Sequence, residues 1–163
     1  TKTLFAQHLE ACSDQIKVVN LILFTPYGPR DNNKLVTYVV KKSIQNDTIA
    51  LSQGLQKIDF VYVKDVASAY LKSIRFLDIN VNDYTDVCLA SGFPVSVREL
   101  VSLVEEVNKT IINKSWGELS ARDYPVVFGD TKKAKDLLDW SATTDLKQGL
   151  KETIYYFKNK YTC

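Results

Sequence analysis

The clearest candidate for ligand chemistry is the segment Leu23-Phe24-Thr25-Pro26-Tyr27-Gly28-Pro29. It completes a run of β-branched and large apolar residues, Val18–Phe24, which predicts a strand that is buried on both faces. The prolines and the glycine at positions 26, 28 and 29 end this strand. Ligands bind at the carboxyl ends of strands in open α/β sheets, so the end of this strand is a candidate ligand site. The segment also has the composition of a rigid strand-ending turn, and the two interpretations are compatible.

The other reactive side chains do not form a catalytic or metal-binding pattern. Asp59, Asp65 and Asp130 are predicted to be turn and helix-capping residues rather than a pair of catalytic carboxylates. His8 is the only histidine, and we expect it at the surface or at an interface. The three cysteines, Cys12, Cys88 and Cys163, are widely spaced and include no C-x-x-C pair. We therefore expect reduced thiols and no metal site.

The elements that must position these residues alternate between strand-like runs and helix-like periods, which is typical of an α/β fold. Helical spacing or capping predicts helices over residues 3–13, 34–44 and 65–76, and others that begin at Ser96, Asp130 and Asp145. Short apolar runs predict strands at 18–24, 49–51, 58–63 and 87–90. No repeat or long linker separates these elements, so we expect one domain, or a large and a small lobe that are intertwined.

The composition excludes several classes of partner. The chain has 163 residues, is 45% hydrophobic and 25% charged, and carries a formal net charge of +2. These values are ordinary for a globular protein and give no reason to expect nucleic acid or an acidic membrane surface as a partner. No apolar run approaches the roughly 20 residues that a membrane span needs. With no secretory leader in view, we expect a cytoplasmic protein.

Three features in this order resemble the second half of an extended short-chain dehydrogenase/reductase: Lys2 at a helix start, the segment 23–29, and Gly54-Leu55-Gln56-Lys57-Ile58-Asp59-Phe60 with its continuation to Val66. The resemblance is to the NAD(P)-dependent nucleotide-sugar epimerases, dehydratases and 4-ketoreductases. It implies that residues 1–163 are the C-terminal half of such an enzyme, with Rossmann-like parallel strands and a smaller α/β substrate-binding lobe. The glycine-rich loop that holds the cofactor phosphates would then lie in a preceding half.

The resemblance also assigns roles to individual residues. Lys2 matches the lysine of the family's Y-x-x-x-K motif, whose tyrosine would lie three residues before Thr1. In that family the lysine bonds the nicotinamide ribose and lowers the pKa of the tyrosine, which makes proton transfer feasible near neutral pH. Phe24 and Pro26 would flank the nicotinamide, and NAD or NADP is the implied cofactor. The implied substrate-binding residues are Thr25, Tyr27, Lys34, Leu35, Leu51, Gln56 and Arg122.

Two departures from the family pattern bear on the substrate. Thr25 stands where relatives have asparagine, and Ile58 stands where the G-x-Q-x-R-D-F motif has an arginine that pairs with the diphosphate. Isoleucine cannot make that pair. Some branches of the family that lack this arginine have a G-A-L-x-x-R segment, which Gly117-Glu118-Leu119-Ser120-Ala121-Arg122 resembles. The resemblance makes Arg122 the candidate phosphate ligand, and its planar fork suits phosphate. On these grounds we expect epimerisation or 4-keto reduction of a nucleoside-diphosphate sugar before 4,6-dehydration.

Other functions remain open at this point. Whether the chain is itself an enzyme is not decided by its sequence, because the catalytic tyrosine is not in it. A non-catalytic binding or dimerisation module derived from the fold is one alternative. A reductase of a non-sugar substrate is another. The resemblance implies a homodimer formed through the helix that carries Lys2.

Overall fold

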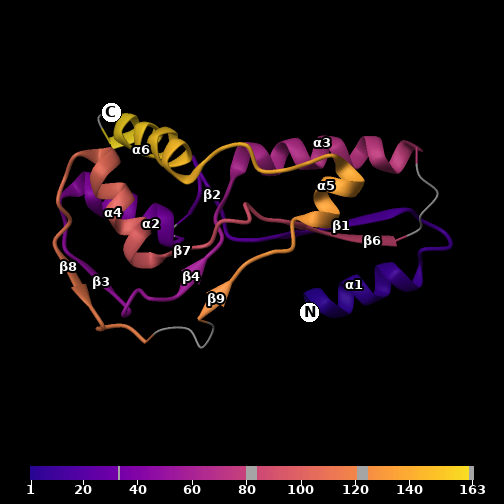
Figure 1. Ribbon diagram of the computed structural model, residues 1–163, viewed down its shortest axis with the longest axis horizontal. Coiled ribbons are helices and arrows are strands. Elements are labelled where there is room, and N and C mark those ends of the chain that lie inside the picture. Colours follow the sequence, from indigo (N-terminus) through magenta and orange to yellow (C-terminus); the bar gives the residue numbers. More distant parts are fainter. Residues whose placement is uncertain (33, 80–83, 121–124, 162–163) are drawn as a thin grey trace.

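The protein is described here by a computed structural model, which covers residues 1–32, 34–79, 84–120 and 125–161 (Figure 1). The helices are α1 (Lys2–Ala11), α2 (Leu35–Gln45), α3 (Val63–Ile79), α4 (Val97–Asn108), α5 (Lys132–Leu138) and α6 (Leu146–Tyr161). The strands are β1 (Val18–Leu23), β2 (Pro26–Tyr27), β3 (Ile49–Leu51), β4 (Lys57–Ile58), β5 (Val61–Tyr62), β6 (Tyr84–Leu89), β7 (Val95–Ser96), β8 (Lys114–Trp116) and β9 (Val126–Val127). The predicted α/β class is confirmed.

The longest strands, β1 and β6, form a parallel pair in which Val18 lies opposite Tyr84 and Leu23 opposite Leu89. Helices α3 and α5 cover one face of this pair, and α1 lies on the other (Figure 1). Parallel strands need a crossover connection, and the chain between β1 and β6 includes the long helix α3. A cluster of buried side chains fills the space between α3, α5 and the pair: Val61, Val66, Ala69, Phe76, Val87, Leu89, Ala134, Leu138 and Trp140.

A second lobe is formed by helices α2, α4 and α6, which pack on one another (Figure 1). Its core includes Val39, Leu100, Val104, Leu150 and Phe157. The parallel pair β3–β8 runs along the edge of this lobe, with Leu51 opposite Trp116. Helix α4 begins with the predicted capping box, because the Ser96 side chain accepts from the Glu99 amide and the Glu99 carboxylate accepts from the Ser96 amide.

Short strands connect the two parts. Strand β4 pairs antiparallel with β7 and parallel with β9, whereas β5 pairs parallel with β2. The strand predicted over residues 58–63 is therefore two strands, because β4 and β5 pair with different partners. Helix α3 begins at Val63 rather than at a cap on Asp65. The carboxylate of Asp65 instead accepts bonds from the Thr143 hydroxyl (2.8 Å) and the Thr144 amide (3.0 Å), so the predicted capping role of Asp65 is wrong.

Asp145 serves the first turn of α6, as predicted, whereas Asp130 serves that of α5 from the position before the N-cap residue, which is Thr131. The Asp130 carboxylate accepts from the Lys132 amide at 2.9 Å, and that of Asp145 accepts from the Gln148 amide at 2.8 Å. Such bonds satisfy amides that have no partner within the helix. No helix among the described residues is both long enough and apolar enough to cross a membrane.

Candidate functional site

The carboxyl end of β1 and the start of α1 face a common pocket of about 760 Å³. Thr1, Lys2 and Phe5 line it from the helix, and Ile22 and Leu23 line it from the strand. Lys2 is exposed, so its ammonium is available to a ligand in this pocket. Lys2 and Leu23, the residue that immediately precedes Phe24, thus line the same pocket.

Phe24 continues the parallel pairing beyond β1, since its amide donates to the Leu89 carbonyl at 3.0 Å. Its ring lies directly against the backbone of Gly129: a Cβ on that glycine would be 2.9 Å from two ring carbons and 2.7 Å from the Ala90 Cβ. A glycine is needed at this point because the two segments approach so closely. The side of the half-buried Phe24 ring that faces Gly129 is therefore fixed.

Thr25, Pro26 and Tyr27 lead from the sheet into the second lobe. The Thr25 carbonyl accepts from the Val61 amide at 3.3 Å, and Thr25 and Pro26 are half-buried. Tyr27 is only 2% exposed, and its hydroxyl donates to the Leu146 carbonyl at 3.4 Å. Burial, followed by the negative charges around it, raises the pKa of Tyr27 well above its usual value. In this structure the Tyr27 ring packs in the core.

Lys34 and Leu35, the next residues with a predicted role, begin helix α2. Lys34 is the exposed N-cap residue, and its ammonium lies 3.3 Å from the Asp31 carboxylate. Leu35 is half-buried and packs against the core of the second lobe. Lys34 therefore presents a cation at the surface, whereas Leu35 presents only part of its side chain.

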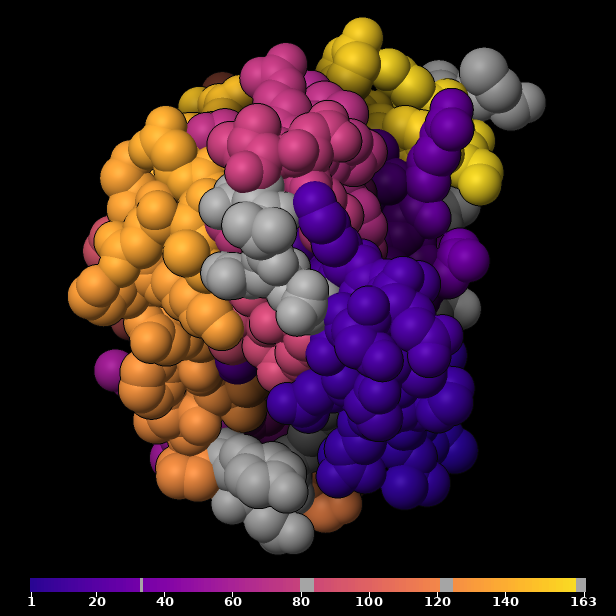
Figure 2. All heavy atoms as spheres, turned by 90° about the vertical axis from the view of Figure 1, so that its right-hand side faces the viewer, coloured from indigo at the N-terminus to yellow at the C-terminus, as the bar shows by residue number. Residues whose placement is uncertain are grey.

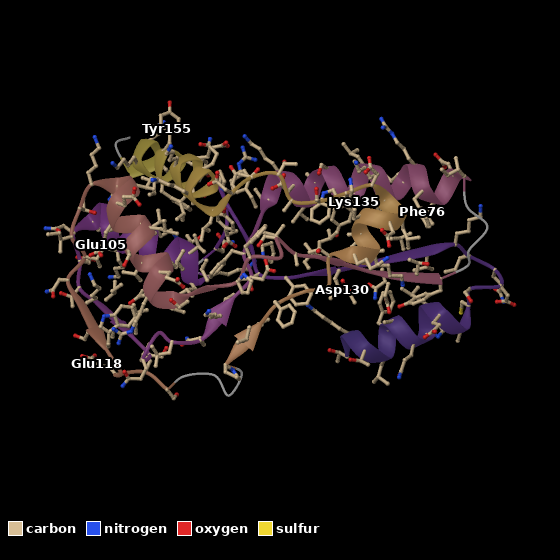
Figure 3. All side chains as sticks on the ribbon, viewed as in Figure 1. Phe76, Glu105, Glu118, Asp130, Lys135 and Tyr155 are labelled. Atoms are coloured by element: carbon tan, nitrogen blue, oxygen red, sulfur yellow. The ribbon has the colours of Figure 1, made fainter. Side chains whose placement is uncertain are left out.

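Leu51 and Gln56 lie on either side of the Gly54 turn. Leu51 is buried, and its carbonyl is the acceptor for the amides of Gly117 (2.9 Å), Glu118 (3.1 Å) and Leu119 (3.3 Å). The Gln56 amide donates to the Ser52 hydroxyl at 3.0 Å. Glu118, labelled in Figure 3, marks where β8 ends beside this turn. Arg122, the predicted phosphate ligand, lies outside the described residues.

The sequence analysis missed a cation–π pair beside this turn. The guanidinium of Arg98 lies 4.5 Å from the centre of the Trp116 ring, and its Nε donates to the Gln53 carbonyl at 2.8 Å. Gly54 makes room for the pair, because a Cβ there would meet the Trp116 ring. Trp116 immediately precedes residues 117–122, a segment that ends in the predicted phosphate ligand Arg122. That adjacency is the signal that could have identified it.

A second pocket, of about 880 Å³, lies away from these residues, between Pro29, the start of α3 and helix α6. In its wall the Glu152 carboxylate accepts from the Tyr62 hydroxyl at 2.8 Å and the Lys64 ammonium at 2.6 Å. These hydrogen bonds, with that from Lys64 the larger cause, hold the pKa of Glu152 below its usual value. None of the predicted site residues that the structure describes lines this pocket.

The fold defines a class of protein. Parallel strands covered by helices, together with a smaller lobe, are the arrangement of an extended short-chain dehydrogenase/reductase. The chain belongs to the NAD dependent epimerase/dehydratase family, whose sequence model matches residues 1–84.

Relatives and solved structures agree with this assignment. CDP-abequose synthase of Salmonella muenchen is 28% identical over 156 residues, which are 94% of this chain and 51% of that protein. The fold is similar to that of UDP-glucuronic acid 4-epimerase from Bacillus cereus, solved with UDP-glucuronic acid and NAD (TM-score 0.85, 22% identity, 95% of this chain and 50% of that one). It is also similar to that of RMD from Pseudomonas aeruginosa, solved with NADPH (TM-score 0.84, 17% identity, 95% and 54%). The chain spans about half the length of the curated relatives it matches.

Proposed function

We propose that these residues form the C-terminal, substrate-binding part of an NAD(P)-dependent enzyme that acts on a nucleoside-diphosphate sugar by epimerisation or 4-keto reduction. The observation that carries the proposal is the shared pocket of Lys2 and the carboxyl end of β1, beside Phe24. Support comes from the family match over residues 1–84 and from a CDP-sugar synthase among the relatives.

The residues present fit the nicotinamide end of the cofactor. Lys2 lines an open pocket, Phe24 offers an aromatic face fixed by Gly129, and Pro26 follows at the lobe boundary. When bound, the cofactor supplies hydride acceptance and donation at a sugar carbon. Lys2 would hold the ribose hydroxyls and lower the pKa of a phenol on an adjacent turn, so that this phenol can exchange a proton with the sugar hydroxyl. The cofactor phosphates would be held by a glycine-rich loop in a preceding half.

The sugar nucleotide would extend from Thr25 into the second lobe. The Thr25 hydroxyl would face the sugar, Lys34 would attract the diphosphate, and the loops at Leu51 and Gln56 would hold the base, with Arg122 as a phosphate ligand. Tyr27 would support this surface from the core, since its hydroxyl is bonded to Leu146. The product would be an activated sugar for surface polysaccharide synthesis, made in the cytoplasm.

Loss of the Lys2 ammonium tests this function in the natural full-length protein. We expect Lys2→Met to lower turnover of a nucleoside-diphosphate sugar by about 100-fold or more, because general acid–base catalysis contributes about 10²–10⁴-fold. Turnover is measured by chromatography of UDP-, CDP- and dTDP-sugars with NAD or NADP. Lys133→Met, an exposed lysine on α5, is the matched control and should retain full activity. Equal activity of the Lys2 variant and the control would contradict the proposal.

A second candidate function is supported by the surface of α1. Leu4 is 70% exposed and Phe5 63% exposed on this helix, which contributes no buried residue. Large exposed apolar side chains of this kind mark association surfaces. They favour a homodimer formed through α1, and they are also what a non-catalytic dimerisation module would show. Sedimentation of Phe5→Asp beside the wild type tests the dimer, which the variant should lose.

A further inference from the structure

The carboxylate of Asp59 is the most completely buried acidic group among the described residues, with a side chain that is 0% exposed. Asp59 forms no ion pair among those residues. It accepts three hydrogen bonds: from the Ser91 amide at 2.7 Å, from the Ser91 hydroxyl at 2.6 Å, and from the Gly92 amide at 2.9 Å. Burying a carboxylate is costly unless hydrogen bonds compensate, and bonds to a charged acceptor are roughly twice as strong as neutral ones. This local structure therefore depends on all three donors.

Backbone amides at and near Asp59 form hydrogen bonds with two further segments. The Asp59 amide donates to the Val127 carbonyl at 3.0 Å, and the Val61 amide donates to the Thr25 carbonyl at 3.3 Å. Residues 59–61 are thus tied to the end of β1, to the turn after β6 and to β9. These three segments come from distant parts of the sequence and meet at the centre of the molecule (Figure 1).

The turn that Asp59 holds lies beside the predicted cofactor residues. Ala90, which precedes Ser91, contacts the same Gly129 backbone that packs against the Phe24 ring. Ser91 also accepts a bond from the Phe93 amide at 3.1 Å, so its hydroxyl links the Asp59 carboxylate to the rest of the turn. Gly92 has a φ of +83°, which a residue with a side chain adopts only under strain. Figure 3 places Asp130, which follows Gly129, at this junction of the lobes.

We propose that Asp59 is a positioning residue for the cofactor end of the site: its carboxylate fixes the Ser91–Gly92 turn, and through Ala90 and Gly129 this turn fixes the Phe24 ring. The inference rests on the proposed function. Asp59 touches neither cofactor nor substrate. Its effect is on the position of Phe24 and the Thr25 backbone, and not on the Leu51–Gln56 end of the site.

The test is Asp59→Asn in the natural full-length protein. The amide has the size of the carboxylate, but its NH₂ group can only donate, so it faces a Ser91 or Gly92 donor without an acceptor. We expect binding of NADH or NADPH, followed by nicotinamide fluorescence, to weaken about tenfold, as expected from loss of one hydrogen bond to a charged group. Binding of UDP, CDP or dTDP, followed by calorimetry, should change by less than about twofold, because those contacts lie at the other end of the site.

Two further variants separate positioning from general stability. Asn108→Ala removes buried bonds to Ser43 and Thr110 in the second lobe, so it lowers the thermal midpoint without touching the turn. It should leave both affinities unchanged. Ser91→Ala removes only one of the three donors to Asp59, and we expect it to weaken NADH or NADPH binding about threefold, because a neutral donor contributes less. This milder variant keeps the test valid if Asp59→Asn does not fold.

The outcomes are distinct. Weaker dinucleotide binding with unchanged nucleoside-diphosphate binding in the Asp59 and Ser91 variants supports the positioning role. Unchanged binding of both ligands, or equal weakening of both in proportion to the fall in the thermal midpoint, overturns it and leaves the proposed function intact. A wild-type protein that binds neither NADH nor NADPH overturns the proposed function, and the inference with it.

Discussion

Helices α4 and α1 both carry large apolar residues, but α4 is much the more amphipathic of the two, and only α4 buries these residues. In α4 the stripe is buried: Val97, Leu100, Val101 and Val104 are each at most 1% exposed, because the helix packs between α2 and α6. In α1 the corresponding residues, Leu4 and Phe5, are largely exposed, and no residue of the helix is buried. Figure 2 shows the N-terminal segment, in indigo, along one side of the molecule, opposite the orange segment that includes α5.

The difference teaches that an amphipathic pattern reports a capacity for burial, and that packing partners decide whether burial occurs. The three-helix lobe supplies its own partners within the described residues. The α1–β1 region does not, and it is there that the open pocket with Lys2 lies. The lobe that we propose to bind the sugar nucleotide is therefore self-supporting, whereas the region around Lys2 offers surface to a ligand or to another protein segment.

The largest difference in the free energy of unfolding should come from truncating one apolar side chain in each helix. In the 163-residue chain, Leu100→Ala should lower the free energy of unfolding by about 3 kcal/mol, since Leu-to-Ala changes in a packed core cost about 2–5 kcal/mol. Phe5→Ala should change it by less than about 0.5 kcal/mol, because little contact is lost. Urea titrations, run at a protein concentration at which the chain sediments as a monomer, measure both. A Phe5 loss as large as that of Leu100 would mean that α1 is covered in solution, and the comparison would break.

Enlarging a side chain should also destabilise the three-helix lobe more than the α1–β1 region. A Cβ on Gly149 would meet the Tyr27 hydroxyl and ring, so Gly149→Ala should cost about 1–2 kcal/mol even though alanine favours a helix. Ala6→Leu enlarges a residue that lines the open pocket beside α1, and should cost less than about 0.5 kcal/mol. Thermal unfolding of both variants is the measurement. Equal costs would show that the two regions are packed alike.

The same contrast marks what could be predicted from the sequence. The α/β class, strand β1 and the capping box at Ser96 follow from local patterns, since their determinants lie within a few residues of one another. The division of residues 58–63 into β4 and β5 depends on strands at positions 26, 95 and 126, which no local pattern contains. The exposure of α1 likewise depends on what lies next to it in space.

For the candidate site, the sequence indicated which segments carry candidate residues, but it did not indicate which distant residues those side chains contact. It selected Lys2, which lines a pocket together with Leu23, and Phe24, which follows Leu23 in the chain. It assigned Asp59 to a turn, but the partners of that carboxylate are 32 and 33 residues away. It expected Tyr27 at the substrate, but the ring is in the core because Gly149, far along the chain, leaves space for it. Long-range hydrogen bonds and close packing leave no local signal.

Helix capping should separate the two regions by a smaller amount. Ser96 forms a reciprocal capping box at α4, whereas Thr1 makes no side-chain capping bond at α1. Ser96→Ala should therefore lower the free energy of unfolding by about 1 kcal/mol, and Thr1→Ala should leave it unchanged. Urea titrations at neutral pH, where the Glu99 partner is ionised, measure the difference. If Ser96→Ala had no effect, the capping box would not contribute to the stability of the lobe.

The smallest effect is a pH dependence in the three-helix lobe. Hydrogen bonds from Lys64 and Tyr62 lower the pKa of Glu152 in the folded state, so the unfolded state binds more protons in the acid range. The stabilisation is complete above the unfolded pKa of about 4.3 and is lost as the pH falls through the lower, folded pKa. Because Glu152 is partly exposed, solvent screening limits its size to less than about 1 kcal/mol. In urea titrations, Glu152→Gln should destabilise the chain by that amount at pH 7. The destabilisation should disappear below the folded pKa of Glu152. The exposed control Glu118→Gln should show no such difference between the two pH values. A Glu152→Gln penalty that persists in acid would assign the stabilisation to the shape of the side chain rather than to its charge.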